Sequence, residues 1–192
     1  MAKKFAIFID TQVDFMLPSA ALYVAGAEKI IGDLNNFAYS LTPEEYAGAL
    51  FTFDTHLTDT YETYEESKQF PIHCVQYTPG WENVINPNLL RSGIVYYTLE
   101  KKVFNMWEEN DVDIVGFEHT PRDTFFDQLK EDGVDTVVVV GVAADFCVKW
   151  AVDGLIERGF KVEIVRNLTA GIVRQIDEVV LDDFADKDVK LV

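Results

Sequence analysis

Polar side chains stand directly after several apolar runs of this sequence, where buried strands would end. The runs are KFAIFID, AGALFTFD, GIVYYTLEK and DTVVVVGVA. In an open parallel sheet, ligands bind in the crevice outside the carboxyl ends of the strands, so these positions are the first place to look for chemistry. The candidates are Asp10, Asp54 and His56, Lys101 or Lys102, and the turn 143–147.

Cys147, in ADFCVKW, has the residue type of a nucleophile. A helix that begins near Asp145 would place its sulfur by the positive end of the helix dipole, which lowers the pKa of a thiol. Backbone N–H groups at that helix end would also hold an oxyanion. The alternative is a buried structural cysteine between Phe146 and Val148, and the stretch on its own favours this alternative.

A cysteine nucleophile needs a base, and histidine is the usual partner. The chain has three histidines, of which His119 stands apart from the other two. Asp10 is the alternative base, because a carboxylate at the end of an apolar strand can take a thiol proton. A lysine at a neighbouring strand end would stabilise negative charge in the transition state. On their own, Asp10 also fits a turn or helix cap and Lys101 a solvated charge.

A second candidate centre combines histidines with carboxylates. Asp54 and His56 share one side of an extended segment, because side chains two residues apart point the same way. His73 follows after a loop rich in acidic residues. Two histidines with one or two carboxylates suit zinc or another first-row divalent ion, whereas two ordinary surface histidines are the alternative. The acidic residues of that loop are Glu62, Glu65 and Glu66.

The elements that must position these residues alternate along the chain. The apolar runs do not alternate strictly with polar residues, which is typical of strands covered on both faces. Gly133 and Gly159 stand where helices should end. The pattern predicts one α/β domain over 1–192, with three layers in the order α/β/α and a mostly parallel, doubly wound sheet. We expect strands at 4–10, 47–54, 93–101, 135–143 and 161–167, helices at 27–41, 121–132, 145–158 and 173–186, and an irregular region from Leu57 to about Asn88.

Composition limits the partners. The chain has 192 residues, 48% of them apolar, and 16 basic against 33 acidic residues give a net charge of −17. Such a charge repels phosphate backbones and anionic lipids, so we expect neither nucleic acid nor a membrane as partner. No apolar segment approaches the roughly 20 residues that span a bilayer, and MAKKFAIFID lacks the features of a signal peptide. We therefore expect a cytoplasmic protein in which Cys74 and Cys147 are free thiols.

The motifs together resemble those of the isochorismatase-like cysteine hydrolases. FIDTQVDFM resembles their opening motif D-x-Q-x-D-F, and GVAADFCV resembles their nucleophile turn G-V-x-x-x-x-C-V. DTH at 54–56 and ESKQFPIHC at 66–74 resemble the D-x-H and E-S-K-x-F-P-x-H-C motifs of the nicotinamidases, or pyrazinamidases, within that superfamily. The resemblance covers nearly the whole chain. It implies hydrolysis of nicotinamide, or a related pyridine carboxamide, through a cysteine thioester in NAD salvage.

The resemblance also implies a role for each matching residue. Asp10, Lys101 and Cys147 match the catalytic residues, and the N–H groups of Ala143 and Cys147 match an oxyanion hole beside a cis Val142–Ala143 bond. The matching metal ligands are Asp54, His56, Glu66 and His73. The aromatic side chains that would wall a slot for a flat ring are Phe15, Phe70, Phe104 and Phe146.

The cofactor implied is a divalent metal, zinc in the first place, with manganese or iron as alternatives, and the resemblance also implies homo-oligomers. The sequence FNMW departs from the Tyr-Ser-x-Phe usual after the lysine, so Lys102 stays a rival to Lys101.

Two other interpretations stay open. A relative in the superfamily would act on a different small amide, a ureido compound or isochorismate, but such relatives generally lack the metal set. A signalling receiver domain or a phosphatase relative also carries an aspartate after its first strand and a lysine after a later one. In this chain Gln12 interrupts the D-x-D of the phosphatases, and neither class needs a cysteine at a helix N-terminus.

Overall fold

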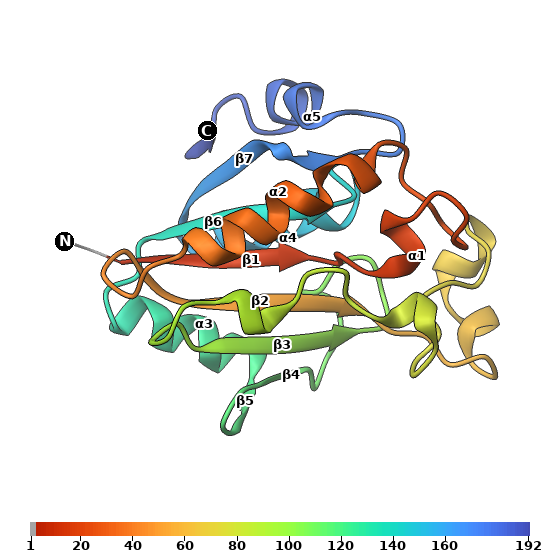
Figure 1. The fold of residues 1–192 in the computed structure, drawn as a ribbon, viewed down its shortest axis with the longest axis horizontal. Coiled ribbons are helices and arrows are strands. Elements are labelled where there is room, and N and C mark those ends of the chain that lie inside the picture. The colour runs from red at the N-terminus through yellow and green to blue at the C-terminus, as the bar shows by residue number, and fades with distance from the viewer. Residues whose placement is uncertain (1–2) are drawn as a thin grey trace.

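One eight-stranded sheet forms the centre of the structure, a computed structural model that describes residues 3–192 (Figure 1). The strand order is β5-β4-β3-β2-β1-β6-β7-β8, and all neighbours are parallel except for the antiparallel pairs that β4 makes with β3 and β5. The strands are β1 (Lys4–Ile9), β2 (Tyr46–Asp54), β3 (Tyr96–Lys101), β4 (Asp113–Val115), β5 (His119–Pro121), β6 (Thr136–Val142), β7 (Lys161–Ala170) and β8 (Val189–Leu191).

The central strands are buried on both faces. In β1, Phe5, Ile7 and Ile9 belong to the apolar core on one side of the sheet, whereas Ala6 and Phe8 belong to the core on the other side. The valines of β6 divide between the two cores in the same alternating way. Burial of both faces explains why the sequence shows near-continuous apolar runs and not an alternation of apolar and polar residues.

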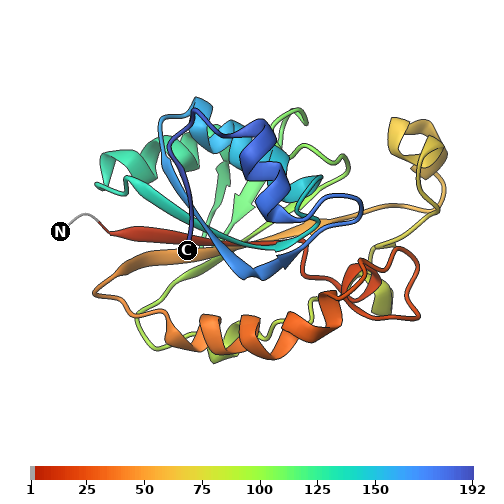
Figure 2. The same cartoon turned by 90° about the horizontal axis from the view of Figure 1, so that it is seen from above.

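Helices cover both faces, which gives the three α/β/α layers predicted (Figure 2). The long helix α2 and the short α1 pack on one face, and α3, α4 and α5 pack on the other. The helical bounds are close to the predicted ones because apolar side chains recur with helical spacing, as in the buried Val148, Ala151, Val152 and Leu155 of α4. The helices are α1 (Val13–Met16), α2 (Ala27–Ser40), α3 (Arg122–Glu131), α4 (Cys147–Glu157) and α5 (Ile176–Asp183).

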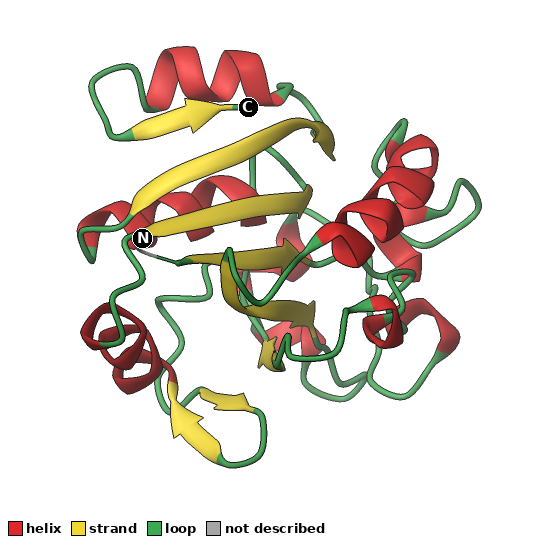
Figure 3. Cartoon of the chain, turned by 60° about the vertical axis from the view of Figure 1, so that its left-hand side comes forward, coloured by secondary structure: helices red, strands yellow, loops and turns green. Residues whose placement is uncertain are grey.

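The order of the strands creates a crevice at one edge of the sheet. The chain adds β2 and β3 on one side of β1, then returns to β6 on the other side and continues to β7 and β8. This reversal between β1 and β6 is the switch point at which open α/β sheets bind ligands. Loops and short helical turns gather beside the carboxyl ends of these strands (Figure 3). The edge of the sheet that the sequence singled out is therefore the edge with room for a site.

The strands β4, β5 and β8 and the short helix α1 were not predicted, and β3, α4 and α5 begin two or three residues later than expected, at Tyr96, Cys147 and Ile176. The strands β4, β5 and β8 have three residues each, too few to produce an apolar run that could be recognised. Helix α4 begins at Cys147 and not near Asp145, because the Asp145 carboxylate accepts N–H groups from a distant loop and does not cap the helix. Residues 57–88 form no strand or α-helix, as expected, but they contain the 3₁₀ turns η1 (Tyr61–Thr63), η2 (Glu65–Lys68), η3 (Pro79–Trp81) and most of η4 (Pro87–Leu89).

The two glycines predicted to end helices do so. Gly133 and Gly159 have φ of +84° and +77°, the left-handed conformation in which glycine is unstrained. Within residues 3–192, no helix combines the length and the apolar character needed to cross a membrane.

Gly141 supplies a test of the close packing of β6 against β1. A Cβ there would lie 2.1 Å from the Ile9 carbonyl oxygen, and φ is +113°. We expect Gly141→Ala to lower the free energy of unfolding by about 3–5 kcal/mol, through overpacking and a strained backbone. Gly32→Ala is the matched control, because Gly32 lies in α2 and its added Cβ would meet no atom within 4 Å beyond its chain neighbours and the backbone of its own helix. It should raise stability by about 0.5–1 kcal/mol. Urea unfolding of both variants measures the difference, and equal stabilities would contradict the argument.

Candidate active site

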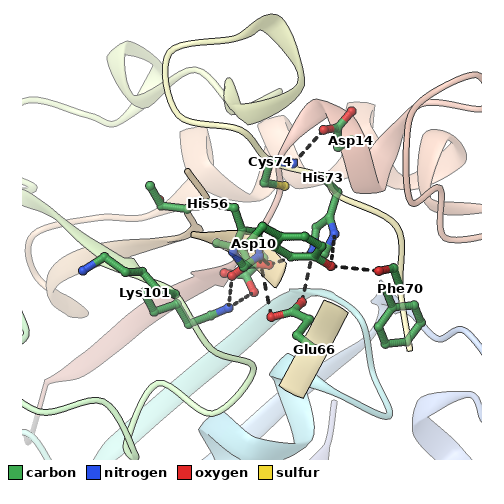
Figure 4. Close-up of polar contacts among 12 residues, drawn as sticks. Asp10, Asp14, His56, Glu66, Phe70, His73, Cys74 and Lys101 are labelled. Carbon is green, nitrogen blue, oxygen red and sulfur yellow. Dashed lines mark hydrogen bonds and ion pairs between the residues drawn. The ribbon is translucent and has the colours of Figure 1, made fainter. Parts of the chain in front are cut away.

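Three side chains from neighbouring strand ends and one from the start of α4 meet at the crevice. The Lys101 ammonium lies 2.9 Å from Asp10 Oδ2, 3.3 Å from Asp54 Oδ1 and 3.7 Å from Cys147 Sγ. All four residues are buried. Figure 4 shows Lys101 directed toward Asp10 and the histidines. The strand order β3-β2-β1-β6 therefore brings together the four residues that the sequence placed at strand ends.

The sheet and its hydrogen bonds fix the two aspartates. Asp54 pairs with Lys101 in the register of β2 and β3. The Asp10 N–H donates to Thr52 Oγ1 at 3.1 Å, and the Thr52 hydroxyl donates to Asp10 Oδ1 at 2.5 Å. The Gln12 amide accepts the Asp54 N–H and donates to the Asp54 carbonyl oxygen, both at 2.8 Å. Gln12 thus holds the end of β2, a task for which a carboxylate, with no donor, is unsuited.

The structure separates the two adjacent lysines. Lys101 is 1% exposed, whereas the Lys102 side chain is 49% exposed and pairs with Glu109 outside the crevice. Burial lowers the pKa of Lys101, but the carboxylates of Asp10 and Asp54 outweigh burial and hold the pKa well above its ordinary value. Lys101 is therefore a permanent positive charge in the crevice.

Cys147 is the first residue of α4 and is buried. Burial raises the pKa of its thiol well above the usual value; Lys101 lowers it, and the charges of Asp10 and Asp54 raise it further. The sequence predicted a lowered pKa for the Cys147 thiol, and this prediction is wrong. Burial and the two carboxylates outweigh Lys101 and the helix dipole. The sulfur is a neutral thiol beside a carboxylate.

The turn before Cys147 presents backbone donors to the cavity. The Val142–Ala143 peptide bond is cis, as the resemblance implies. Among residues 3–192, no protein acceptor receives the N–H of Ala143 or of Cys147, and both residues line the same cavity. Two free N–H groups beside a thiol are the arrangement that stabilises an oxyanion.

The four proposed metal ligands converge next to Lys101. Asp54, His56, Glu66 and His73 are buried, and one ligand atom from each lies within 4.8 Å of the others. His73 Nε2 is 3.0 Å from Asp54 Oδ2 and 3.1 Å from Glu66 Oε1, and His56 Nε2 is 3.1 Å from Asp54 Oδ2. Figure 4 shows Glu66 directed at these rings. The other two acidic candidates, Glu62 and Glu65, are exposed.

The unsatisfied atoms of this group fit a divalent cation. Both Glu66 oxygens are buried without a hydrogen-bond donor. Burial lowers the pKa of His73, but the neighbouring carboxylates of Asp54 and Glu66 raise it to about 10. Burial raises the pKa of Asp54, which Lys101 and the two histidines hold well below its usual value. Two carboxylates and two imidazoles whose ligand atoms converge on one point are the donor set of a zinc or similar divalent site.

The loop that carries His73 is held by residues that the sequence interpretation did not single out. The Asp14 carboxylate accepts the Cys74 N–H at 2.7 Å (Figure 4). The Tyr61 hydroxyl lies 3.0 Å from the carbonyl oxygens of Phe70 and Pro71. His73 Nδ1 donates to the Pro71 carbonyl at 2.8 Å, which leaves Nε2 facing the carboxylates. Asp14 lies within FIDTQVDFM, so that motif was the available signal.

A narrow cavity lies above Cys147 and reaches the metal ligands. The space open to the centre of a water molecule is about 20 Å³, enough for about one water. Phe70, Phe104 and Phe146 pack edge to face or tilted, with ring centroids 5.5 to 5.7 Å apart. All four aromatic residues predicted from the sequence line the cavity, but two aliphatic ones were missed because isolated aliphatic residues in loops carry no signal. The lining residues are Phe15, Leu22, Asp54, Glu66, Phe70, Phe104, Ala143, Phe146, Cys147 and Ile172.

Comparisons with known proteins agree with this geometry. The isochorismatase domain matches residues 4–187. A nicotinamidase/pyrazinamidase of Mycobacterium tuberculosis is 28% identical over 97% of this chain and 96% of its own length. A nicotinamidase of Acinetobacter baylyi is 31% identical over 75% of this chain and 70% of its own.

Among solved structures, a zinc complex of the pyrazinamidase of Pyrococcus horikoshii superposes with a TM-score of 0.76 and 26% identity, over 99% of this chain and 98% of that one. The match over almost the whole length, together with the strand-end chemistry, assigns the chain: it belongs to the isochorismatase family of hydrolases.

Proposed function

We propose that this chain hydrolyses nicotinamide, or a closely related pyridine carboxamide, to the acid and ammonia through a cysteine thioester. The observation that carries the proposal is the contact of Lys101 with Asp10, Asp54 and Cys147, which joins a nucleophile and base to a buried donor set for a divalent ion. The names of the relatives, nicotinamidase and pyrazinamidase, support the same substrate class. The reaction would serve NAD salvage.

Asp10 would act first as a base. Because the Cys147 thiol is neutral in this site, attack requires transfer of its proton to the adjacent Asp10 carboxylate. The sulfur then bonds to the carboxamide carbon. The oxygen of the tetrahedral adduct accepts hydrogen bonds from the backbone N–H groups of Ala143 and Cys147. The Lys101 ammonium would stabilise the negative charge on Asp10 before the proton transfer and on the Cys147 sulfur as the thiol loses its proton.

The acid and base roles then reverse. Asp10 returns its proton to the amine as the carbon–nitrogen bond breaks, which releases ammonia and leaves a thioester on Cys147. A water molecule gives a proton to Asp10 and attacks the thioester carbon, and the carbon–sulfur bond breaks. The proton returns to the thiolate, so one amide and one water become one carboxylate and one ammonium ion.

The substrate ring would enter the cavity beside Cys147. The aromatic side chains would move apart to admit it, because the cavity as it stands has space for about one water molecule. Phe70, Phe104 and Phe146 offer apolar faces and edges, so they would orient a flat ring and exclude water from the thiol. The residues that would hold a divalent ion, zinc in the first place, are Asp54, His56, Glu66 and His73. When bound, the ion would supply a Lewis acid that attracts the ring nitrogen and so orients the carboxamide toward Cys147.

Replacement of the nucleophile gives the first functional test. Cys147→Ala should lower ammonia release from nicotinamide by at least about 10³-fold, because no thioester can form. Cys74→Ala is the matched control, since Cys74 is also a free, buried cysteine. It should keep the activity. Both variants should retain their metal, and normal turnover by Cys147→Ala would exclude the mechanism.

The wild-type protein should also be offered ureido compounds and isochorismate in the same assay. Release of ammonia from nicotinamide alone is the expected result. Turnover of either of the other substrates in preference to nicotinamide would assign the chain to a different branch of the family.

The donor set predicts a metal requirement that one histidine variant can test. His73→Ala should lower the content of divalent metal from about one ion per chain to a small fraction, with loss of ammonia release. His119→Ala is the control, because the His119 side chain is 71% exposed and lies outside the site. Metal analysis of the purified variants measures the effect, and a chelator should reproduce it in the wild type. Full metal content in His73→Ala would refute the site.

The two lysines give a further matched pair. Lys101→Ala would leave two buried carboxylates without their cation, so we expect a loss of about 3–5 kcal/mol in unfolding free energy together with loss of activity. Lys102→Ala should change stability by less than about 0.5 kcal/mol and keep the activity. Urea unfolding and the ammonia assay measure both quantities. Reversed effects in the two variants would move the catalytic role to Lys102.

A further inference from the structure

The turn that carries the nucleophile is tied to a loop that is distant in sequence. Asp145 lies between Ala143 and Cys147, and its carboxylate accepts three successive backbone N–H groups from the loop after β7. The distances are 2.9 Å from Ile172, 2.8 Å from Val173 and 2.9 Å from Arg174. These are charge-assisted hydrogen bonds, which are stronger than neutral ones.

The loop is shaped around that carboxylate. A Cβ at Gly171 would lie 1.9 Å from the Arg174 carbonyl oxygen and 3.3 Å from Asp145 Oδ1, so the turn leaves no room for a side chain. The Gln175 amide closes the turn through bonds of 3.2 Å to the Gly171 N–H and carbonyl oxygen. Ile172 and Val173 are 39% and 79% exposed, so packing contributes little to the loop. Hydrogen bonds and ion pairs hold it, including the pairs of Arg174 with Asp182 and Asp183.

One residue of this loop belongs to the cavity. Ile172 lines the same narrow space as Cys147 and Ala143, on a segment that is separate from the aromatic side chains. The backbone of Ile172 is bound directly to Asp145, since the Ile172 N–H donates one of the three hydrogen bonds. Asp145 therefore connects a wall of the cavity to the turn that holds both free N–H groups.

We propose that Asp145 is a positioning residue that holds Ile172 as the outer wall of the substrate slot over Cys147. This inference rests on the proposed amide hydrolysis, in which the slot binds a flat ring. Because the carboxylate has two oxygens and no donor, it can satisfy three N–H groups at once. An asparagine has one carbonyl oxygen, and its amide NH₂ would face the remaining N–H groups.

Steady-state kinetics test the positioning role. Asp145→Asn should raise KM for nicotinamide roughly tenfold and change kcat by less than about threefold, because a displaced wall removes binding common to ground and transition states. Ile172→Ala should raise KM in the same way, and the double variant should be no worse than Asp145→Asn, since both changes remove one wall. A fall in kcat with unchanged KM would overturn the proposal.

Two measurements need no turnover, so they judge the proposal even if nicotinamide is not the substrate. Hydrogen exchange of the 172–174 amides should become at least roughly tenfold faster in Asp145→Asn, as expected for lost bonds to a charged acceptor. Alkylation of Cys147 by iodoacetamide should accelerate in both Asp145→Asn and Ile172→Ala as the wall opens. Unchanged exchange or unchanged alkylation would refute it.

Asp135→Asn is the matched control. Asp135 precedes β6, at the end opposite the turn, and its carboxylate also accepts side-chain hydrogen bonds, from Thr136 and Lys161. This variant should match the wild type in KM, exchange of the 172–174 amides and alkylation of Cys147. The same effects in Asp135→Asn and Asp145→Asn would show a general loss of stability and would overturn the specific role of Asp145.

Discussion

The buried contact of Lys101 with two carboxylates is the interaction on which the rest of the site depends. Charges removed from water are costly unless each has a partner at hydrogen-bonding distance. Lys101 meets this condition for Asp10 and Asp54 at once, at 2.9 and 3.3 Å. That geometry requires β1, β2 and β3 to be adjacent, parallel and in the observed register, so the sheet topology and the charge pairing support each other.

The same pairing sets the chemistry on either side. Asp54 is shared, since one oxygen faces Lys101 and the other faces His56 and His73. A change in charge at His56 or His73 therefore changes the electrostatic potential at Lys101 and, through Lys101, at Asp10 and Cys147. The neutral thiol of Cys147 follows from its burial and from the nearby carboxylates, so as the proposed nucleophile it would need a base and not only a helix N-terminus.

Sequence reasoning succeeded where chemistry is tied to the sheet. Asp10, Asp54, Lys101 and Cys147 each close or follow an apolar run, and parallel strands carry such ends to one edge. The pattern alone left Lys101 or Lys102 open and favoured a buried structural cysteine at 147, so the full set required the family resemblance. The short strands β4, β5 and β8 gave no pattern, and the tie from Asp145 to a distant loop left no local signal. The choice of Glu66 over Glu62 and Glu65 as the proposed metal ligand required the family resemblance, because residue spacing in an irregular loop does not determine where each side chain points.

The division between sheet and loops separates the proposed reacting groups from the cavity walls that would contact a substrate. The proposed reacting groups stand at the ends of strands or, for Cys147, at the start of α4. Most other walls of the cavity come from segments that connect strands and helices: Leu22, Phe70, Phe104 and Ile172 lie in loops, and Phe15 lies in the short helix α1. Loops tolerate substitution better than buried strands do. In the proposed reaction, the size and shape of the substrate ring would therefore be recognised by residues that can vary without disturbing the buried charges.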